Sequence, residues 1–192
     1  MILGIDEAGR GALAGPLVVA GACLDTVKTK ALFKDSKTLS FKQRSKLYDE
    51  EIKGIVPYWV SVISIETIDR INVLAATMRG MSRVIQRCTL SPTQILIDGN
   101  RIPPNPTEIP IEAIVKGDQL IAEISCASII AKVIRDRIMI RAMTSDPRFA
   151  FDTHFGYGTT QHYNEIEAHG ILKGLHRKSF KLFKPIPLIK MV

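Results

Sequence analysis

The first residues constrain the fold most strongly, because an apolar strand there runs into two adjacent carboxylates and then a Gly-Arg-Gly turn. Residues 2–11 read ILGIDEAGRG. Apolar residues of this kind favour a buried strand, so Asp6 and Glu7 must emerge at a sheet edge or in a cleft. Neighbouring carboxylates repel each other unless a cation lies between them. The stretch therefore predicts a metal, a basic partner or open solvent at the end of the first strand.

The length and composition indicate one globular domain. The chain has 192 residues, of which 46% are hydrophobic and 23% are charged. A chain of that size can bury a proper core. We expect a single domain over residues 1–192, with a core over about 1–145 and a basic helical extension over about 146–192. No membrane-length apolar run or secretory leader is visible, so we expect a cytoplasmic protein without membrane association, and we assume a monomer.

The positive charge is concentrated at the C-terminal end. The whole chain carries a net charge of +7, and residues 171–192 contain six basic residues and no acidic one, which leaves +1 for the remainder. Such asymmetry favours a polyanionic partner, either a nucleic acid or a membrane surface, over a merely solvated basic end. The same tail is a candidate for recruiting a replication partner.

The hydrophobic pattern predicts an α/β fold with a mixed sheet. The segments ILGID, LVVAGACL and YWVSVISI read as an antiparallel meander, and TQILID and IEAIVKGD as two further strands. Between them, residues 66–88 show the apolar spacing of one amphipathic helix. Asp118 is expected to cap a long helix that begins at Gln119 and is rich in small residues, which would let it approach the sheet closely.

Four acids share a position in this scheme. Asp6 and Glu7 end the first strand, Asp98 ends a later strand, and Asp118 opens the long helix. A converging carboxylate cluster indicates bound divalent metal, and oxygen ligands without His or Cys at ligand spacing favour Mg²⁺ or Mn²⁺. The alternative for each acid is a capping, turn or solvated role. Two metals on such a site can cleave phosphodiesters, so a basic protein of this kind could be a nuclease.

The motifs resemble those of the bacterial ribonuclease HII family, in order and in approximate spacing, over residues 4–180. The matching segments are GIDEAGRGALAGP, KDSKTLS, LIDGN, VKGD, ASIIAKVIRDR, GYGT and HRKSF. The resemblance implies a ribonuclease H-like fold, dependence on Mg²⁺ or Mn²⁺, and cleavage of RNA in RNA–DNA hybrids. It also implies incision 5′ of single ribonucleotides in duplex DNA, which leaves 3′-hydroxyl and 5′-phosphate ends. The GRG segment fits this family better than the related type HIII.

The resemblance also assigns roles to individual residues. The family's four catalytic and metal-holding acids fall on Asp6, Glu7, Asp98 and Asp118. The remaining positions are expected to bind substrate, and they are Gly9, Arg10 and Gly11 as readers of the ribose 2′-hydroxyl, Tyr157 at the ribonucleotide, and Lys37, His176 and Arg177 at the nucleic acid. Ala12 stands where the family pattern leads us to expect proline, and this difference touches no catalytic role.

Two competing interpretations stay open on the sequence alone. A nuclease or phosphotransferase of the same fold acting on DNA would need no reader of the 2′-hydroxyl. A basic protein that binds RNA–DNA hybrids without cleaving them would use its carboxylates structurally. Incision of duplex DNA containing one ribonucleotide, beside an all-DNA control, separates all three.

Overall fold

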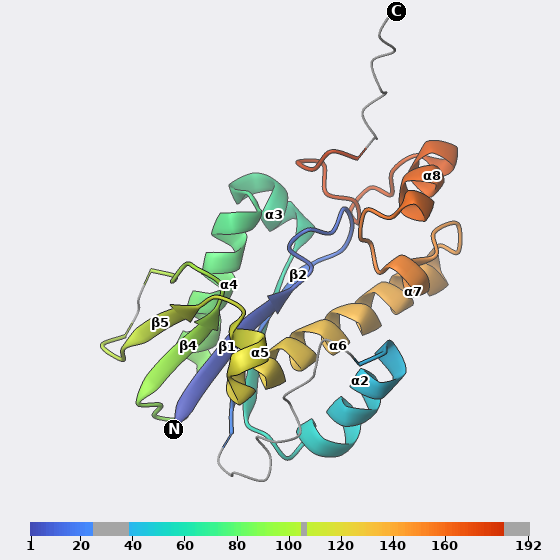
Figure 1. Ribbon diagram of the computed structural model, residues 1–192. Coiled ribbons are helices and arrows are strands. Elements are labelled where there is room, and N and C mark those ends of the chain that lie inside the picture. The colour runs from blue at the N-terminus through green and yellow to red at the C-terminus, as the bar shows by residue number, and fades with distance from the viewer. Residues whose placement is uncertain (25–38, 105–106, 183–192) are drawn as a thin grey trace, which may run out of the picture.

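The computed structural model describes residues 1–24, 39–104 and 107–182, which form a five-stranded sheet with helices on both faces (Figure 1). The strand order is β3-β2-β1-β4-β5. Antiparallel pairing joins β3 to β2 and β2 to β1, whereas β1, β4 and β5 run parallel. The predicted meander and mixed sheet are therefore confirmed. The strands are β1 (Ile2–Ala8), β2 (Leu17–Cys23), β3 (Tyr58–Ile63), β4 (Gln94–Asp98) and β5 (Ile111–Ile114).

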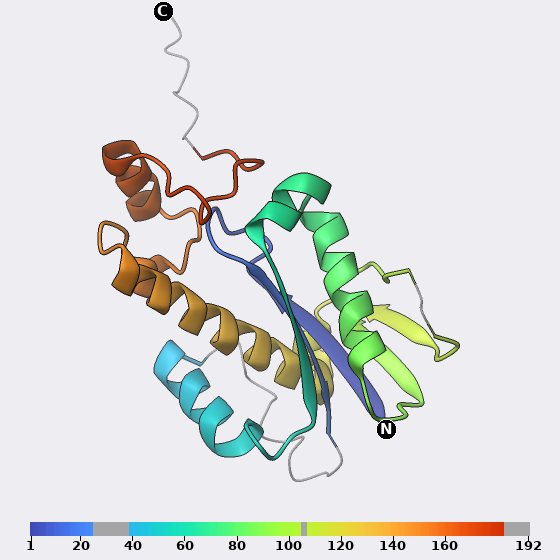
Figure 2. The same cartoon turned by 180° about the vertical axis from the view of Figure 1, so that it is seen from behind.

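Helices cover the two faces of the sheet unequally (Figures 1 and 2). One face carries α6 (Ala122–Ser145), with α2 (Phe41–Leu47) and the π-helical turn η2 (Tyr48–Ile52) beside it. The other face carries α4 (Val73–Arg87), preceded by α3 (Ile65–Ile71). The short α7 (Phe151–His154) and α8 (Thr160–His169) lie beyond the far end of α6.

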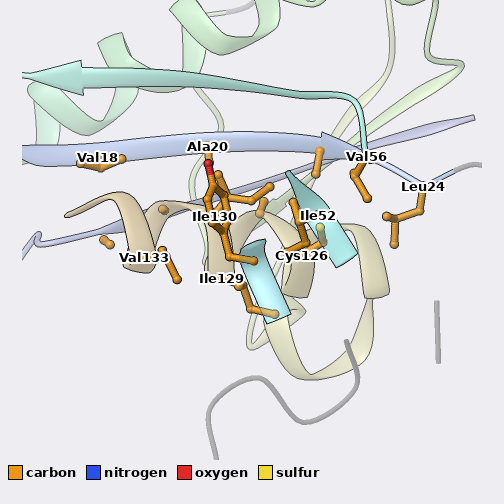
Figure 3. Close-up of a cluster of buried hydrophobic side chains, with 14 residues drawn as sticks. Val18, Ala20, Leu24, Ile52, Val56, Cys126, Ile129, Ile130 and Val133 are labelled. Carbon is orange, nitrogen blue, oxygen red and sulfur yellow. The ribbon is translucent and has the colours of Figure 1, made fainter. Parts of the chain in front are cut away.

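The two faces of the sheet bury separate apolar clusters because successive strand residues point to opposite sides. Val18 and Ala20 of β2 face α6, where they pack with Ile130 and its neighbours (Figure 3). Leu17 and Val19 of the same strand pack on the α4 side. A third cluster joins the end of α6 to the C-terminal segment. The third cluster includes Leu13 and Ala14, so it packs the loop that follows β1 against that C-terminal segment.

The close approach of α6 to β1 is set by Gly4. A Cβ placed on Gly4 would lie 2.2 Å from the backbone carbon of Glu123, so no larger residue fits without moving the helix. The expectation that α6 lies close to the sheet is thereby confirmed. Helix α6 is the longest at 24 residues, but across the described ranges no helix combines the length and apolarity needed to cross a membrane.

Two expectations from the sequence are wrong in detail, and one helix was not predicted. The helix predicted over residues 66–88 is interrupted at Asn72, whose φ of 65° ends α3 and whose side chain caps α4 by accepting from the Ala75 N–H. Asp118 is not an N-cap, because it lies inside the separate helix α5 (Gly117–Leu120), and extended backbone at Ile121 precedes α6. Helix α2 had no predicted counterpart, although Ser40 caps it with a complete capping box.

Candidate active site

The four predicted acids lie together at one edge of the sheet. Ile5 of β1 pairs with Ile97 of β4, so Asp6, two residues before the end of β1, lies beside Asp98, the last residue of β4. Asp118 joins them from α5, and its backbone N–H donates to Asp98 Oδ1 at 3.3 Å. The parallel pairing of β1 with β4 thus brings together residues that are far apart in the sequence.

The electrostatics of this edge disfavour bare carboxylates. Burial, with the charges of Glu7 and Asp98 adding to it, raises the pKa of Asp6 well above its usual value. A backbone N–H from Glu7 at 2.7 Å and the Ser128 hydroxyl of α6 oppose that rise by hydrogen bonding. Burial likewise raises the pKa of Glu7. Arg10, whose Nη1 lies 3.7 Å from Glu7 Oε1, lowers that pKa, and the charge of Asp98 raises it. A positive charge placed at this edge would relieve the repulsion.

The donor set fits a hard divalent cation. All four side chains offer carboxylate oxygens, the ligands that Mg²⁺ and Mn²⁺ prefer. Within the described part of the chain, no three His, Cys, Asp or Glu side chains already form a coordination group. The acids are therefore gathered at one edge by the fold without being preassembled around a metal. The three cysteines, Cys23, Cys88 and Cys126, are free thiols elsewhere in the fold.

The GRG turn is shaped by a buried arginine that sequence reasoning missed. Gly9 has a φ of 92°, and a Cβ there would lie 2.0 Å from Arg135 Nε. Arg135, fully buried in α6, donates to three carbonyl oxygens of the flanking loops, those of Ala14, Pro16 and Phe155, at 2.8 to 3.0 Å. Its position in the predicted helix gave no signal, because its acceptors are backbone atoms of residues distant in the sequence.

Gly11 and Arg10 differ from Gly9 in facing open space. A Cβ at Gly11 would meet nothing within 4 Å, so packing inside the protein does not require glycine there. The Arg10 side chain is 51% exposed. These positions leave the backbone of the turn accessible to a ligand.

The structure corrects the expectation that His176 and Arg177 contact nucleic acid. Both side chains are buried, with 1% and 0% exposure respectively. Arg177 donates to the carbonyl oxygens of Gly15 at 2.9 Å and Arg10 at 3.2 Å, and therefore holds the GRG loop from within. Burial, together with Arg135, lowers the pKa of Arg177 to about 10. Two nitrogens of the guanidinium donate to backbone carbonyls, and the group is buried away from the surface.

Tyr157 belongs to a loop that is fastened to the GRG turn. Tyr157 and Ala12 form an isolated β-bridge, and the N–H groups of Leu13 and Ala14 donate to the Gly156 carbonyl oxygen. The half-buried Tyr157 ring lies 5.0 Å from Lys132 Nζ and 4.9 Å from the Arg135 guanidinium carbon. Backbone hydrogen bonds therefore join the Tyr157 loop to the loop that follows the GRG turn. Lys37, the remaining candidate, falls outside the described residues.

Three buried histidines form a hydrogen-bond network next to these two loops. His162 Nδ1 lies 3.0 Å from the Tyr157 carbonyl oxygen and must donate to it, so its Nε2 accepts from His176 Nε2 at 3.1 Å. His176 Nδ1 accepts from the Leu172 N–H, which matches that tautomer. His154 accepts from the Gly156 N–H and donates to Glu165. Every ring nitrogen is satisfied when all three rings are neutral, so their role is structural.

One cavity of about 350 Å³ is lined by one of the four acids, by the GRG turn and by Tyr157. Its lining comprises Glu7, Ala8, Gly9, Arg10, Gly11, Arg44, Ser128, Ile129, Lys132 and Tyr157. An acid from the carboxylate edge, the accessible turn and an aromatic ring thus open onto the same space. Arg44 and Lys132 had not been predicted as site residues. A buried acid that was also missed, Glu123, lines a second cavity with Asp118.

The mixed sheet with helices on both faces defines a protein with the ribonuclease H fold, with the four acids at one edge of the sheet. Solved structures share that fold: the RNase HII of the PCNA:RNase HII complex from Archaeoglobus fulgidus has a TM-score of 0.75 at 28% identity and covers 92% of both chains. Ribonuclease H2 from Pyrococcus horikoshii OT3 has a TM-score of 0.74 at 26% identity over 94% of both chains. At 21% identity, a Bst-RNase HIII in complex with Mn²⁺ shows the fold alone, with a TM-score of 0.73 over 94% of this chain and 67% of the other.

The chain belongs to the ribonuclease HII family, whose family model matches residues 3–183. A relative named Ribonuclease HII from Acidovorax sp. (strain JS42) is 46% identical over 94% of this chain and 85% of its own length. The corresponding protein of Burkholderia thailandensis is 45% identical over 94% of this chain and 83% of its own length. The protein is therefore a metal-dependent endoribonuclease, and the interpretation as a binding protein without activity is wrong.

Proposed function

We propose that this enzyme cleaves RNA in RNA–DNA hybrids and incises duplex DNA on the 5′ side of a single embedded ribonucleotide, leaving 3′-hydroxyl and 5′-phosphate ends. The observation that carries the proposal is the shared cavity, where Glu7 from the carboxylate edge meets the accessible GRG turn and Tyr157. Cleaving groups and a surface suited to inspecting one nucleotide are thus adjacent.

The four acids at the sheet edge are the proposed metal holders. Asp6, Glu7, Asp98 and Asp118 would bind two divalent cations, Mg²⁺ or Mn²⁺, and their mutual repulsion supports this assignment. Such ions, when bound, supply the charge that activates the attacking water and stabilises the leaving 3′ oxygen. The protein's own contribution is to hold the carboxylates at fixed positions, with Ser128 and the Glu7 N–H orienting Asp6.

Discrimination between RNA and DNA is assigned to the GRG turn and Tyr157. The absence of a side chain at Gly11 lets a nucleotide approach the peptide groups of the turn, which can hydrogen-bond a 2′-hydroxyl, and Gly9 lets the chain make the turn against Arg135. Tyr157 offers a flat ring on the same cavity for contact with the sugar or base. Arg135, Arg177 and the three histidines hold these readers in place without touching substrate.

The test compares three substrates with Mg²⁺ present: a long RNA–DNA hybrid, duplex DNA with one ribonucleotide, and all-DNA duplex. The proposal expects cleavage of the first two and no cleavage of the third. Cleavage of all three at similar rates would favour the DNA nuclease alternative. Cleavage of the hybrid alone would remove the single-ribonucleotide part of the proposal.

The C-terminal tail has a separate proposed role. We propose that residues 1–192 form one domain. We also propose that its basic end beyond Leu182 contacts a replication clamp, because the name of the Archaeoglobus fulgidus neighbour pairs an RNase HII with PCNA. Leu182 itself is buried in the third apolar cluster, so a truncation should begin at residue 183. Loss of clamp binding by that truncation, with hybrid cleavage retained, is the expected result. A shallower salt dependence of substrate binding would instead assign Lys184 and Lys190 to nucleic acid.

A further inference from the structure

Two cations from different elements meet at one buried carboxylate beside the proposed substrate cavity. Asp136 of α6 has 0% exposure, and its Oδ1 accepts from Lys132 Nζ at 2.7 Å. Arg44 of α2 approaches the other oxygen, Oδ2, with its Nη1 at 3.8 Å. Lys132 and Asp136 are one helical turn apart, whereas Arg44 lies 92 positions before Asp136 in the sequence.

The charges of this cluster do not cancel. One carboxylate lies between two cations, which leaves an excess of one positive charge at the cavity wall. A buried aspartate needs only one cationic partner for neutrality, and Lys132 already supplies it at hydrogen-bond distance. Arg44 is therefore more than Asp136 requires, and its excess charge lies where Arg44 and Lys132 both line the cavity.

Both cations have more N–H donors than Asp136 accepts. A lysine ammonium has three N–H donors and an arginine guanidinium has five. Lys132 gives one to Asp136, and Arg44 Nη2 donates to the Leu39 carbonyl oxygen at 2.7 Å. Their side chains are 25% and 14% exposed, enough to accept a ligand while the stems remain fixed. The pair is thus preorganised for an anion.

The pair lies next to Tyr157, the residue assigned to the substrate nucleotide. Lys132 Nζ lies 5.0 Å from the centre of the Tyr157 ring and 4.8 Å from that of Phe155. This inference rests on the substrate reading proposed above: we propose that Lys132 and Arg44 bind a backbone phosphate of the substrate duplex next to the nucleotide at Tyr157. Asp136 is a positioning residue that sets both cations, and the contact is to phosphate, so it is indifferent to the sugar.

The experiment measures binding of an all-DNA duplex in the presence of Mg²⁺, as a function of salt, for wild type and for Lys132→Gln and Arg44→Gln. Each variant should weaken binding and make the slope of log K against log salt about one unit shallower. Lys132→Arg should restore most of the slope. Lys46→Gln is the matched control, because Lys46 lies on the same helix as Arg44 but is 72% exposed and pairs with Glu50 at 3.9 Å.

A second measurement separates substrate contact from structural support. On duplex DNA with one ribonucleotide, the two variants should raise KM several-fold with little change in kcat. Wild-type slopes in both variants, with only the melting temperature lowered, would overturn the proposal and leave a structural ion cluster. An equal slope change in Lys46→Gln would overturn it as well, since general surface charge would explain the effect. The all-DNA binding readout is independent of ribonucleotide incision, so failure of the proposed function would be seen separately.

Discussion

At the residue scale, Asp118 offers the sharpest test of the carboxylate edge. It is 2% exposed and its backbone contacts Asp98, so Asp118→Asn should keep the fold while removing one charge from the proposed metal site. We expect turnover to fall about 100-fold or more with substrate affinity and melting temperature nearly unchanged. Asp152→Asn, on the exposed surface of α7, is the control and should cleave at the wild-type rate. Near wild-type turnover of Asp118→Asn would remove Asp118 from the proposed set.

Tyr157 separates ribonucleotide reading from general binding. Tyr157→Ala removes the ring from the cavity, and its loss should reduce incision at a single ribonucleotide at least about tenfold more than cleavage of a long hybrid, which offers many registers. Tyr157→Phe keeps the ring, so its incision rate at a single ribonucleotide should lie between those of wild type and Tyr157→Ala. Steady-state rates on both substrates check this. Equal losses on both would assign Tyr157 to support of the loop alone.

At the element scale, the two glycines of the GRG turn should behave differently. Gly9→Ala forces a side chain into a φ of 92° and against Arg135, which should lower stability by about 1 to 3 kcal/mol. Gly11→Ala meets nothing within 4 Å and should leave the melting temperature unchanged while impairing incision, because its methyl group would occupy the path of the nucleotide. Thermal melts and incision rates of both variants test this. Full activity in Gly11→Ala would contradict a backbone reader at that position.

The histidine network behind the Tyr157 loop predicts acid sensitivity. Burial, with His154 adding to it, lowers the pKa of His162 to about 4, and the unfolded chain titrates near 6.5, so the unfolded state binds more protons between these values. The stability contribution is therefore complete above pH 6.5 and is lost as the pH falls toward 4, by about 2 to 3 kcal/mol. His162→Asn should flatten this dependence in denaturant melts, whereas the exposed His169→Gln should not. An unchanged pH dependence in His162→Asn would refute the assignment.

At the scale of the whole molecule, sequence reasoning succeeds where the pattern is local and fails where it is not. The strands follow from apolar runs, and Asp98 ends one of them as predicted. The break at Asn72 escaped because a single left-handed residue interrupts an otherwise continuous helical period. Arg135 was not predicted and Arg177 was assigned to the nucleic acid, because their acceptors are backbone carbonyls that only the tertiary fold brings close. Basic residues near a motif do not reveal whether they face substrate or the interior.

The most direct test of the central claim is to map the cut on end-labelled duplex DNA that contains one ribonucleotide, with Mg²⁺ and beside an all-DNA duplex of the same sequence. Glu7, the accessible turn and Tyr157 on one cavity, with the other three acids nearby, predict a single cut immediately 5′ of the ribonucleotide, with 3′-hydroxyl and 5′-phosphate ends, and an intact all-DNA duplex. Cuts scattered through both duplexes, or an uncut ribonucleotide-containing strand, would contradict the account.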